Sequence, residues 1–468
     1  MDCHTMVMAM SLGIVEPGRP VSIGSVDHAT LPLRCHWERE EDAERCTSIL
    51  DLGAASWALQ VDQAGFVPPV PDADGMVDLY LYDFGGGGAY TSCSTWEDTD
   101  PADGLTGCPG YVVLSPGLTD ELMPTYVAHE FNHVLQYAID FYEPTYPVWE
   151  GIASAFEIWT FPEDVQLTID YSFADFQAAP WAGLLNLGSY LWPRYGAGWA
   201  YEYSTAIWGL HLDHHFGDGA GSSSAALWLA LAQRGPNTVD VIDGLEVVTG
   251  DWRDTLLSLS AERILLGTED APEWLPQQQA KLRLVVDGEY TQADLPLTHR
   301  PSIMPYTTGA VYVRVGGVEG AVDIEVEAAD GQWGVVVARG PELTWVAERT
   351  LRWSGDGDIV VGLVNLDHDA FATTGAFGDL TASQREVRLR VSAVEAPDDT
   401  EDTGVTEDTG AAEDTTEEPP DDTGRDERAP PSETGLAKGC ATAPAPLPAL
   451  YGVALVAVAL QRARGRRQ

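Results

Sequence analysis

The spacing of apolar and polar residues changes twice along the 468-residue chain. The first 118 residues are expected to form short strands and loops with one helix, Ala43–Gln60, and alternation predicts strands at Val77–Tyr82 and Tyr111–Leu114. A mainly helical region follows and runs to about residue 268. Its first helix is expected to have Thr119 or Asp120 as its N-cap. The predicted helices are 120–139, 148–159, 199–216, 222–234 and 252–267.

From about residue 280 to residue 393 the period becomes two, which is typical of strands. Glycine and aspartate turns separate the segments, and this spacing predicts a small all-β sandwich. The fold class is therefore α+β, with a mixed N-terminal part, a helical part and then the sandwich. The predicted strands are Lys281–Val286, Ala310–Val315, Val322–Glu327, Gly334–Ala338, Asp358–Leu363 and Val387–Val391.

Composition divides the chain into five parts, 1–24, 25–275, 276–393, 394–434 and 435–468. The fourth part is rich in Asp, Glu, Thr, Pro and Gly, so it buries too little apolar surface to fold and is expected to be a disordered, acidic linker. The last part combines a cysteine, an apolar run and four arginines. The apolar run is too short to span a bilayer comfortably, and the arginines would hold the C-terminus on the cytoplasmic side.

The C-terminal sorting tags of myxobacterial surface proteins have a similar order of features. This chain resembles them in its acidic linker, followed by Cys440, the apolar run and the arginine cluster. The resemblance implies processing near Cys440, a tail that is in the membrane only transiently, and a mature protein at the cell surface, in the outer membrane or outside the cell. The alternative is an ordinary weak membrane anchor.

The net charge of −48 argues against nucleic acid as a partner, because binding to a phosphate backbone requires clustered Lys and Arg. Membrane contact is expected through the C-terminal tail alone, and the protein is expected to be a monomer. The charge favours solubility and carries no information about the fold.

Four of the six cysteines form two local pairs, Cys35–Cys46 and Cys93–Cys108. Disulfides at these positions would imply an oxidising compartment, and the alternative is four free thiols. The N-terminus, Met1–Val15, contains an apolar run with no Lys or Arg before it. It is a poor signal peptide, so this segment is either the remnant of one or a first strand.

The chemistry centres on the sequence Ala128-His129-Glu130-Phe131-Asn132-His133. Two histidines four residues apart lie on one face of a helix, about 6 Å apart along its axis. Their imidazoles can converge on one Zn²⁺, and the glutamate after the first histidine can serve as the general base. Val127, Val134, Leu135 and Ala138 form the apolar face of the same helix.

A catalytic zinc site needs a third protein ligand, and the next predicted helix offers Glu150 and Glu157. The HExxH pattern with Trp149-Glu150-Gly151-Ile152-Ala153 resembles the gluzincin metallopeptidases, in which a glutamate on a second helix completes the site. The resemblance implies a zincin-like fold for residues 25–275 and Glu150 as the third ligand. Glu157 then lies behind the ligands or toward the substrate, and the alternative is that Glu157 is the ligand.

More narrowly, residues 25–390 resemble secreted metalloproteases of myxobacteria. That similarity includes Gly65–Pro68 and Asp78–Leu81 but is specific only around residues 125–157. Related folds supply a Tyr or His from a later helix to the developing oxyanion. This role is expected for Tyr203, with Tyr201 and Tyr195 as rivals.

Three further features are open to more than one interpretation. His211 and His215 are also four residues apart, so a second metal site is conceivable, but solvent-facing or supporting roles are favoured for His211, His214 and His215. One of them is an alternative oxyanion donor. The aspartates at positions 72, 74 and 78 resemble a calcium loop only faintly, and a plain turn is favoured.

The sequence thus predicts an exported, cell-surface zinc metalloendopeptidase that acts on a peptide or protein substrate. Its metal ligands are expected to be His129, His133 and Glu150, with Glu130 and Tyr203 as catalytic groups. One alternative is a non-catalytic surface binding or adhesion protein with a degenerate metallopeptidase domain. Another is a zinc hydrolase that acts on substrates other than peptides.

Overall fold

The computed structural model describes residues 18–394 apart from 86, 96, 142, 144, 165–172, 187, 197, 199, 234–240, 276–281 and 368–384. These residues belong to one compact unit, residues 1–397. The predicted linker and C-terminal tag lie outside the described residues from position 395 onward, as do the first 17 residues of the predicted N-terminal segment. Among the described helices, none is long and apolar enough to cross a membrane.

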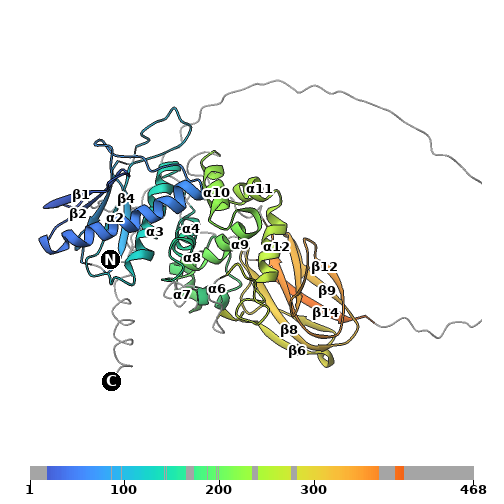
Figure 1. The fold of residues 1–468 in the computed structure, drawn as a ribbon. Helices are drawn as coiled ribbons and strands as arrows, with labels where there is room; N and C mark the ends of the chain where they lie inside the picture. The colour runs from blue at the N-terminus through green and yellow to red at the C-terminus, as the bar shows by residue number, and fades with distance from the viewer. Residues whose placement is uncertain are drawn as a thin grey trace, which may run out of the picture. The chain divides into compact units, whose positions relative to one another are not determined.

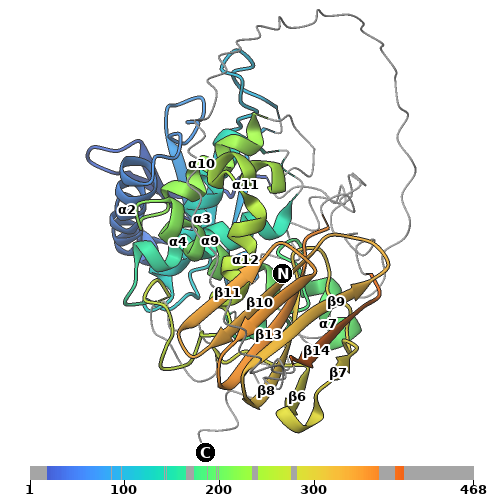
Figure 2. The ribbon, with the colours of Figure 1, turned by 90° about the vertical axis from the view of Figure 1, so that its right-hand side faces the viewer.

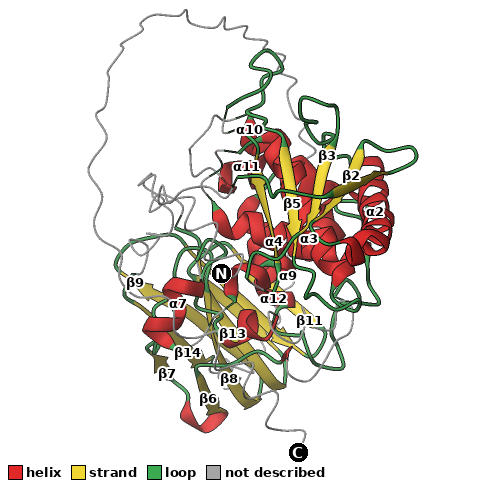
Figure 3. Ribbon diagram, turned by 90° about the vertical axis from the view of Figure 1, so that its left-hand side faces the viewer, coloured by secondary structure: helices red, strands yellow, loops and turns green. Residues whose placement is uncertain are grey.

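A five-stranded mixed sheet forms the N-terminal part (Figure 3). Strands β2 and β3 run parallel, as do β3 and β5, whereas β1 and β4 are antiparallel strands at the two edges. The predicted strands Val77–Tyr82 and Tyr111–Leu114 are confirmed as β3 and β5. In sheet order the strands are β1 (Gly24–Asp27), β2 (Leu33–Trp37), β3 (Val77–Leu81), β5 (Gly110–Leu114) and β4 (Ala89–Cys93).

Helices α2 (Ala43–Trp57) and α3 (Met123–Ile139) pack on this sheet (Figure 1). α2 confirms the predicted helix and continues as a π-helical turn, η2 (Ala58–Gln63). The predicted N-cap of α3 was wrong. Leu122 is its N-cap, because the preceding residues form a turn in which the N–H groups of Leu122 and Met123 both bond to the Thr119 carbonyl.

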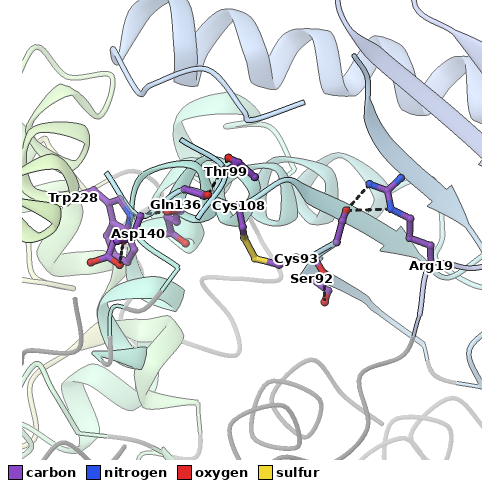
Figure 4. The surroundings of a disulfide bond; sticks show 11 residues. Arg19, Ser92, Cys93, Thr99, Cys108, Gln136, Asp140 and Trp228 are labelled. Atoms are coloured by element: carbon purple, nitrogen blue, oxygen red, sulfur yellow. Dashed lines mark hydrogen bonds between the residues drawn. A yellow bond between two sulfur atoms is a disulfide. The ribbon is translucent and has the colours of Figure 1, made fainter. Parts of the chain in front are cut away.

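Two disulfides fasten the sheet to its surroundings, and both were predicted as pairs. Cys35 on β2 is joined to Cys46 on α2, across 11 positions of sequence. Cys93 at the end of β4 is joined to Cys108 just before β5, across 15 positions (Figure 4). The N–H groups of Cys108 and Thr106 donate to the carbonyl groups of Tyr137 and Ile139, and these bonds hold the loop against the C-terminal end of α3.

The helical part follows α3 and contains eight described helices. The predicted helices at 148–159, 222–234 and 252–267 are confirmed in place, whereas the predicted helix at 199–216 is two helices. It breaks at Thr205, whose hydroxyl donates to a backbone carbonyl on α8. The helices are α4 (Tyr146–Thr160), α6 (Ala174–Ala178), α7 (Gly188–Tyr195), α8 (Tyr201–Ser204), α9 (Ala206–Phe216), α10 (Ser222–Ala232), α11 (Val241–Thr249) and α12 (Trp252–Glu262).

The C-terminal part is a β region of two sheets, with strand orders β11-β10-β13-β8-β6 and β12-β9-β14-β7 (Figure 2). Five predicted strands are confirmed here. The sixth, Lys281–Val286, was wrong, because Leu282–Val286 is irregular and the first strand begins at Gly288. The strands are β6 (Gly288–Thr291), β7 (Leu297–His299), β8 (Ala310–Val318), β9 (Ala321–Ala328), β10 (Trp333–Arg339), β11 (Glu342–Val346), β12 (Thr350–Ser354), β13 (Gly357–Asn365) and β14 (Val387–Ala393).

Helix α12 joins the helical part to this β region. It packs on β10, β11 and β13, and the Tyr312 hydroxyl on β8 donates to the Ser260 carbonyl at 2.9 Å. Because β10 lies between α12 and the second sheet, six of its seven residues are buried, whereas burial alternates along β9. One hydrophobic core therefore runs from the helices into the β region.

Candidate metal centre

Helix α3 brings the two histidines of the motif together. Their rings are edge to face with centroids 4.7 Å apart, and the two Nε2 atoms are 3.1 Å apart. The helix is buried along most of its length, so His129 and His133 are only 5% and 6% exposed. Two imidazole nitrogens thus converge on one point that is shielded from bulk water.

Helix α4 supplies the third donor from the opposite side. One carboxylate oxygen of Glu150, Oε2, lies 3.1 Å from His129 Nε2 and 3.7 Å from His133 Nε2. Ligands bonded to zinc at about 2.0–2.2 Å in a tetrahedral site are about 3.3–3.6 Å apart. The three donor atoms already lie near that separation, so this buried His129, His133, Glu150 group could bind a metal ion.

The second oxygen of Glu150 provides an independent test of the fit. Glu150 is completely buried, and its Oε1 atom has no hydrogen-bond partner among the described residues. A buried carboxylate oxygen without a donor is costly, on the order of 1–3 kcal/mol or more for a charged group. A bound cation would remove that cost, so the residues present suit a metal.

The outer nitrogens of both rings are held by side chains. Glu157 accepts from Nδ1 of His129 at 2.7 Å, and Gln136 Oε1 accepts from Nδ1 of His133 at 2.6 Å. Gln136 is itself fixed, since its Nε2 donates to the Trp149 carbonyl at 3.1 Å. With the protons on Nδ1, both neutral imidazoles present the Nε2 lone pair to the centre.

These contacts distinguish between Glu150 and Glu157, the two candidates for the third ligand. Glu150 faces the Nε2 atoms of both histidines, whereas Glu157 faces the opposite edge of the His129 ring. The group of converging donors accordingly contains Glu150 and not Glu157.

Without a cation, the buried charges of the group shift the pKa values of His129 and Glu150 in opposite directions. Burial lowers the pKa of His129, but hydrogen bonds to Glu150 and Glu157 outweigh burial and raise that pKa well above its ordinary value. Burial raises the pKa of Glu150, but the charges and hydrogen bonds of both histidines hold it well below its usual range. The negative charge of the ionised Glu150 is thus balanced by a proton on His129. A divalent cation bound to these residues would replace that proton.

Glu130 lies beside this group and is anchored from the sheet. Thr91 on the edge strand β4 donates to Glu130 Oε2 at 2.7 Å. Glu130 is 1% exposed, and burial raises the pKa of its carboxyl group against the opposing charges of His129 and His133. A carboxylate with a raised pKa is suited to accepting and returning a proton.

Of the three tyrosines weighed for oxyanion binding, the structure brings Tyr203 to the metal centre. Its ring on α8 lies 5.9 Å from that of His129. The Tyr201 hydroxyl donates to the Ala182 carbonyl at 2.8 Å, and the hydroxyl groups of Tyr195 and Tyr306 are 2.9 Å apart.

The other sequence candidates lie elsewhere. A solvent-facing role was wrong for His211, which is completely buried because α9 presents it to α12, whereas His214 and His215 are exposed. At the faint calcium loop, Asp72 and Asp74 belong to a tight turn, in which the Gly75 N–H bonds to the Asp72 carbonyl. Their carboxylates pair with arginines, as does that of Asp78.

Two side chains that hold residues of the candidate centre in place were not found from the sequence. Gln136 is three residues after His133 on the same helix face, so helical spacing could have indicated it. Thr91 is 39 residues from Glu130 and carries no local signal.

The chain was compared with models of known protein families and with curated proteins. It matches no family model and no curated protein.

Proposed function

We propose that this chain is a zinc-dependent metallopeptidase whose ligands are His129, His133 and Glu150. The convergence of these three donors, together with the second, unpartnered oxygen of the buried Glu150 carboxylate, carries the proposal. Two imidazoles and one carboxylate are the donor set of many catalytic zinc sites, which keep a fourth position for water. The mixed sheet with α3 and α4 would then be a zincin-like domain of the gluzincin type.

Zinc held there would supply a Lewis acid and lower the pKa of a water molecule toward neutrality. Glu130 accepts a proton from the attacking water and returns it to the leaving amine, so no proton is gained or lost over the reaction. The hydrogen bond from Thr91 keeps the Glu130 carboxylate in one orientation. Tyr203 donates to the oxygen on which negative charge develops.

The setting that we propose is outside the cytosol. The two disulfides favour an oxidising compartment. With the resemblance of residues 435–468 to a sorting tag, this supports an exported monomer at the cell surface, which meets the membrane through its tail.

A cleavage assay with the purified full-length chain on a mixed peptide library tests the proposal. Cleavage should stop after treatment with a chelator and return when Zn²⁺ is added. Glu130→Gln should keep the metal and lower kcat by about 10²–10⁴-fold, since it removes the general base. His133→Ala should bind little metal at this centre.

Glu163→Gln is the matched control, because this exposed carboxylate follows α4 and lies outside the metal group. The reaction proposed here is wrong if the chain binds zinc but cleaves no peptide. Unchanged cleavage by Glu130→Gln would place the general base elsewhere.

A further inference from the structure

A second group of two histidines and a carboxylate lies away from the metal centre described above. His211 and His215 occupy one face of α9, and Glu262 is the last residue of α12. One ligand atom from each lies within 4.8 Å of the others. Helices α9 and α12 contact each other and are neighbours in both views (Figure 1, Figure 2).

The glutamate bridges the two rings. Glu262 Oε1 lies 2.9 Å from His215 Nε2, and Glu262 Oε2 lies 3.9 Å from His211 Nε2. Trp274 Nε1 donates to Oε2 at 2.5 Å and so fixes the orientation of the carboxylate. The first separation lies slightly below, and the second slightly above, the value of about 3.3–3.6 Å expected between ligands of one tetrahedral zinc ion. They involve different oxygens of Glu262, so the carboxylate would bind the ion through both.

His211 makes its polar contacts through one ring nitrogen only, unlike the buried His299. His299 in the β region uses both ring nitrogens, bonding Tyr290 at 2.9 Å and Asp287 at 2.8 Å. His211 is fully buried, yet its Nδ1 has no hydrogen-bond partner among the described residues. Its polar contacts are at Nε2, toward Ser258 and Glu262, inside the group.

Access and charge also suit a cation. The His215 side chain is 33% exposed and Glu262 is 13% exposed, so an ion could reach the group from solvent while His211 forms its buried wall. The rings of His211 and His215 are 4.5 Å apart, and that of His214 is 4.8 Å from His215. One metal ion can bind two neutral imidazoles where two imidazolium groups would repel each other.

We propose that His211, His215 and Glu262 bind a second divalent transition-metal ion, with zinc favoured by the donor set. The residue after His211 is Leu212, so this site lacks the glutamate that stands beside His129. Its role is structural. The ion fastens α9, which packs on α4 behind the first centre, to α12, which packs on the β region.

Zinc titration of the chelator-treated full-length chain tests this site, with bound metal measured after gel filtration. Wild-type protein should bind about two ions per chain, and His215→Ala and Glu262→Gln should each bind about one. His133→Ala should also bind about one, and adding zinc should raise the melting temperature of that variant. His133→Ala combined with His215→Ala should show no such rise.

His214→Ala is the matched control, because His214 is exposed on the same turn and is not one of the three donors. It should bind as much zinc as wild type. The second site is overturned if His133→Ala binds no zinc, if His215→Ala binds as much as wild type, or if the second ion binds more weakly than about 1 mM. Failure of peptide cleavage would leave these outcomes unchanged, so the two proposals are tested separately.

Discussion

At the scale of single residues, the candidate metal centre is made of side chains whose contacts leave little freedom. Gln136 and Glu157 hold the outer nitrogens of the two histidines, and Thr91 holds the glutamate between them. Each of these groups is at least nine-tenths buried, so water competes weakly for their hydrogen bonds. Preorganisation of this kind is what a zinc site needs in its surroundings as well as in its ligands.

The first prediction concerns Glu157. Glu157→Gln should lower zinc affinity at the first centre by about tenfold or more, because a neutral amide supports the His129 imidazole less well than a carboxylate does. Competition with a chromophoric chelator would measure the change, with Glu163→Gln as the control. An affinity equal to that of wild type would show that the contact at Nδ1 contributes nothing to binding.

The second prediction concerns the pH dependence of stability. Burial raises the pKa of Asp78, but a hydrogen bond from His36 and the charge of Arg19 outweigh burial and lower that pKa. The unfolded chain therefore binds more protons than the folded chain near pH 4. The stabilisation is complete above the unfolded pKa of about 3.9 and is lost as pH falls through the lower, folded value.

Asp78→Asn should lower the free energy of unfolding at pH 7 by about 1–3 kcal/mol and flatten its dependence on pH below about pH 4. Urea unfolding at a series of pH values would measure both effects. Asp74→Asn removes a carboxylate that is 53% exposed and pairs with Arg34, so it should change stability by less than about 1 kcal/mol. Equal effects of the two variants would contradict the argument.

At the scale of elements, the position of Glu150 depends on how closely α4 approaches the turn between α8 and α9. A Cβ atom on Gly151 would come within 2.1 Å of Thr205 Oγ1. That hydroxyl donates to the carbonyl groups of Pro147 and Glu202, and so ties α4 to α8. The glycine after Glu150 is therefore required by packing.

The third prediction is that Gly151→Ala pushes α4 outward and carries Glu150 away from the histidines. Overpacking should cost about 1–3 kcal/mol of stability, and zinc affinity should fall with it. Thermal unfolding and zinc titration would measure the two effects. Combining Gly151→Ala with Thr205→Ala removes the clashing oxygen and should restore part of the affinity; no recovery would mean that the clash with Thr205 is not the cause.

At the scale of the whole compact unit, the helical part and the β region share one hydrophobic core. Leu257 on α12 approaches Gly334 on β10 so closely that a Cβ atom there would lie 2.5 Å from Leu257 Cδ2. Leu256 and Leu257 are 4% and 1% exposed. Burying one such side chain contributes about 1.5–3 kcal/mol, against a total stability of about 5–15 kcal/mol.

The fourth prediction follows from this shared core. A chain that ends at residue 275 should not form a stable fold, because α12 would expose the face that packs on β10, β11 and β13. A chain that ends at Val394 keeps all the described strands and should unfold cooperatively, like the full-length protein. Thermal unfolding followed by circular dichroism would compare the two, and a cooperative transition in the shorter chain would contradict the prediction.

The sequence by itself determined the features that depend on interactions between residues close together in the chain. Helical spacing placed His129 and His133 on one face, the changes of period located five of the strands in the β region, and the local cysteine pairs were the disulfides that form. These inferences succeed because the interacting groups lie within about one turn of helix, or within a loop of 11 to 15 positions.

Tertiary structure alone decided the contacts between distant segments. Thr91 meets Glu130 across 39 positions, and His215 meets Glu262 across 47. The break at Thr205 and the burial of His211 likewise depend on how α9 packs against α4 and α12. Local periodicity shows that a helix has an apolar face but not which element will cover it, because that choice is made by packing across the whole core.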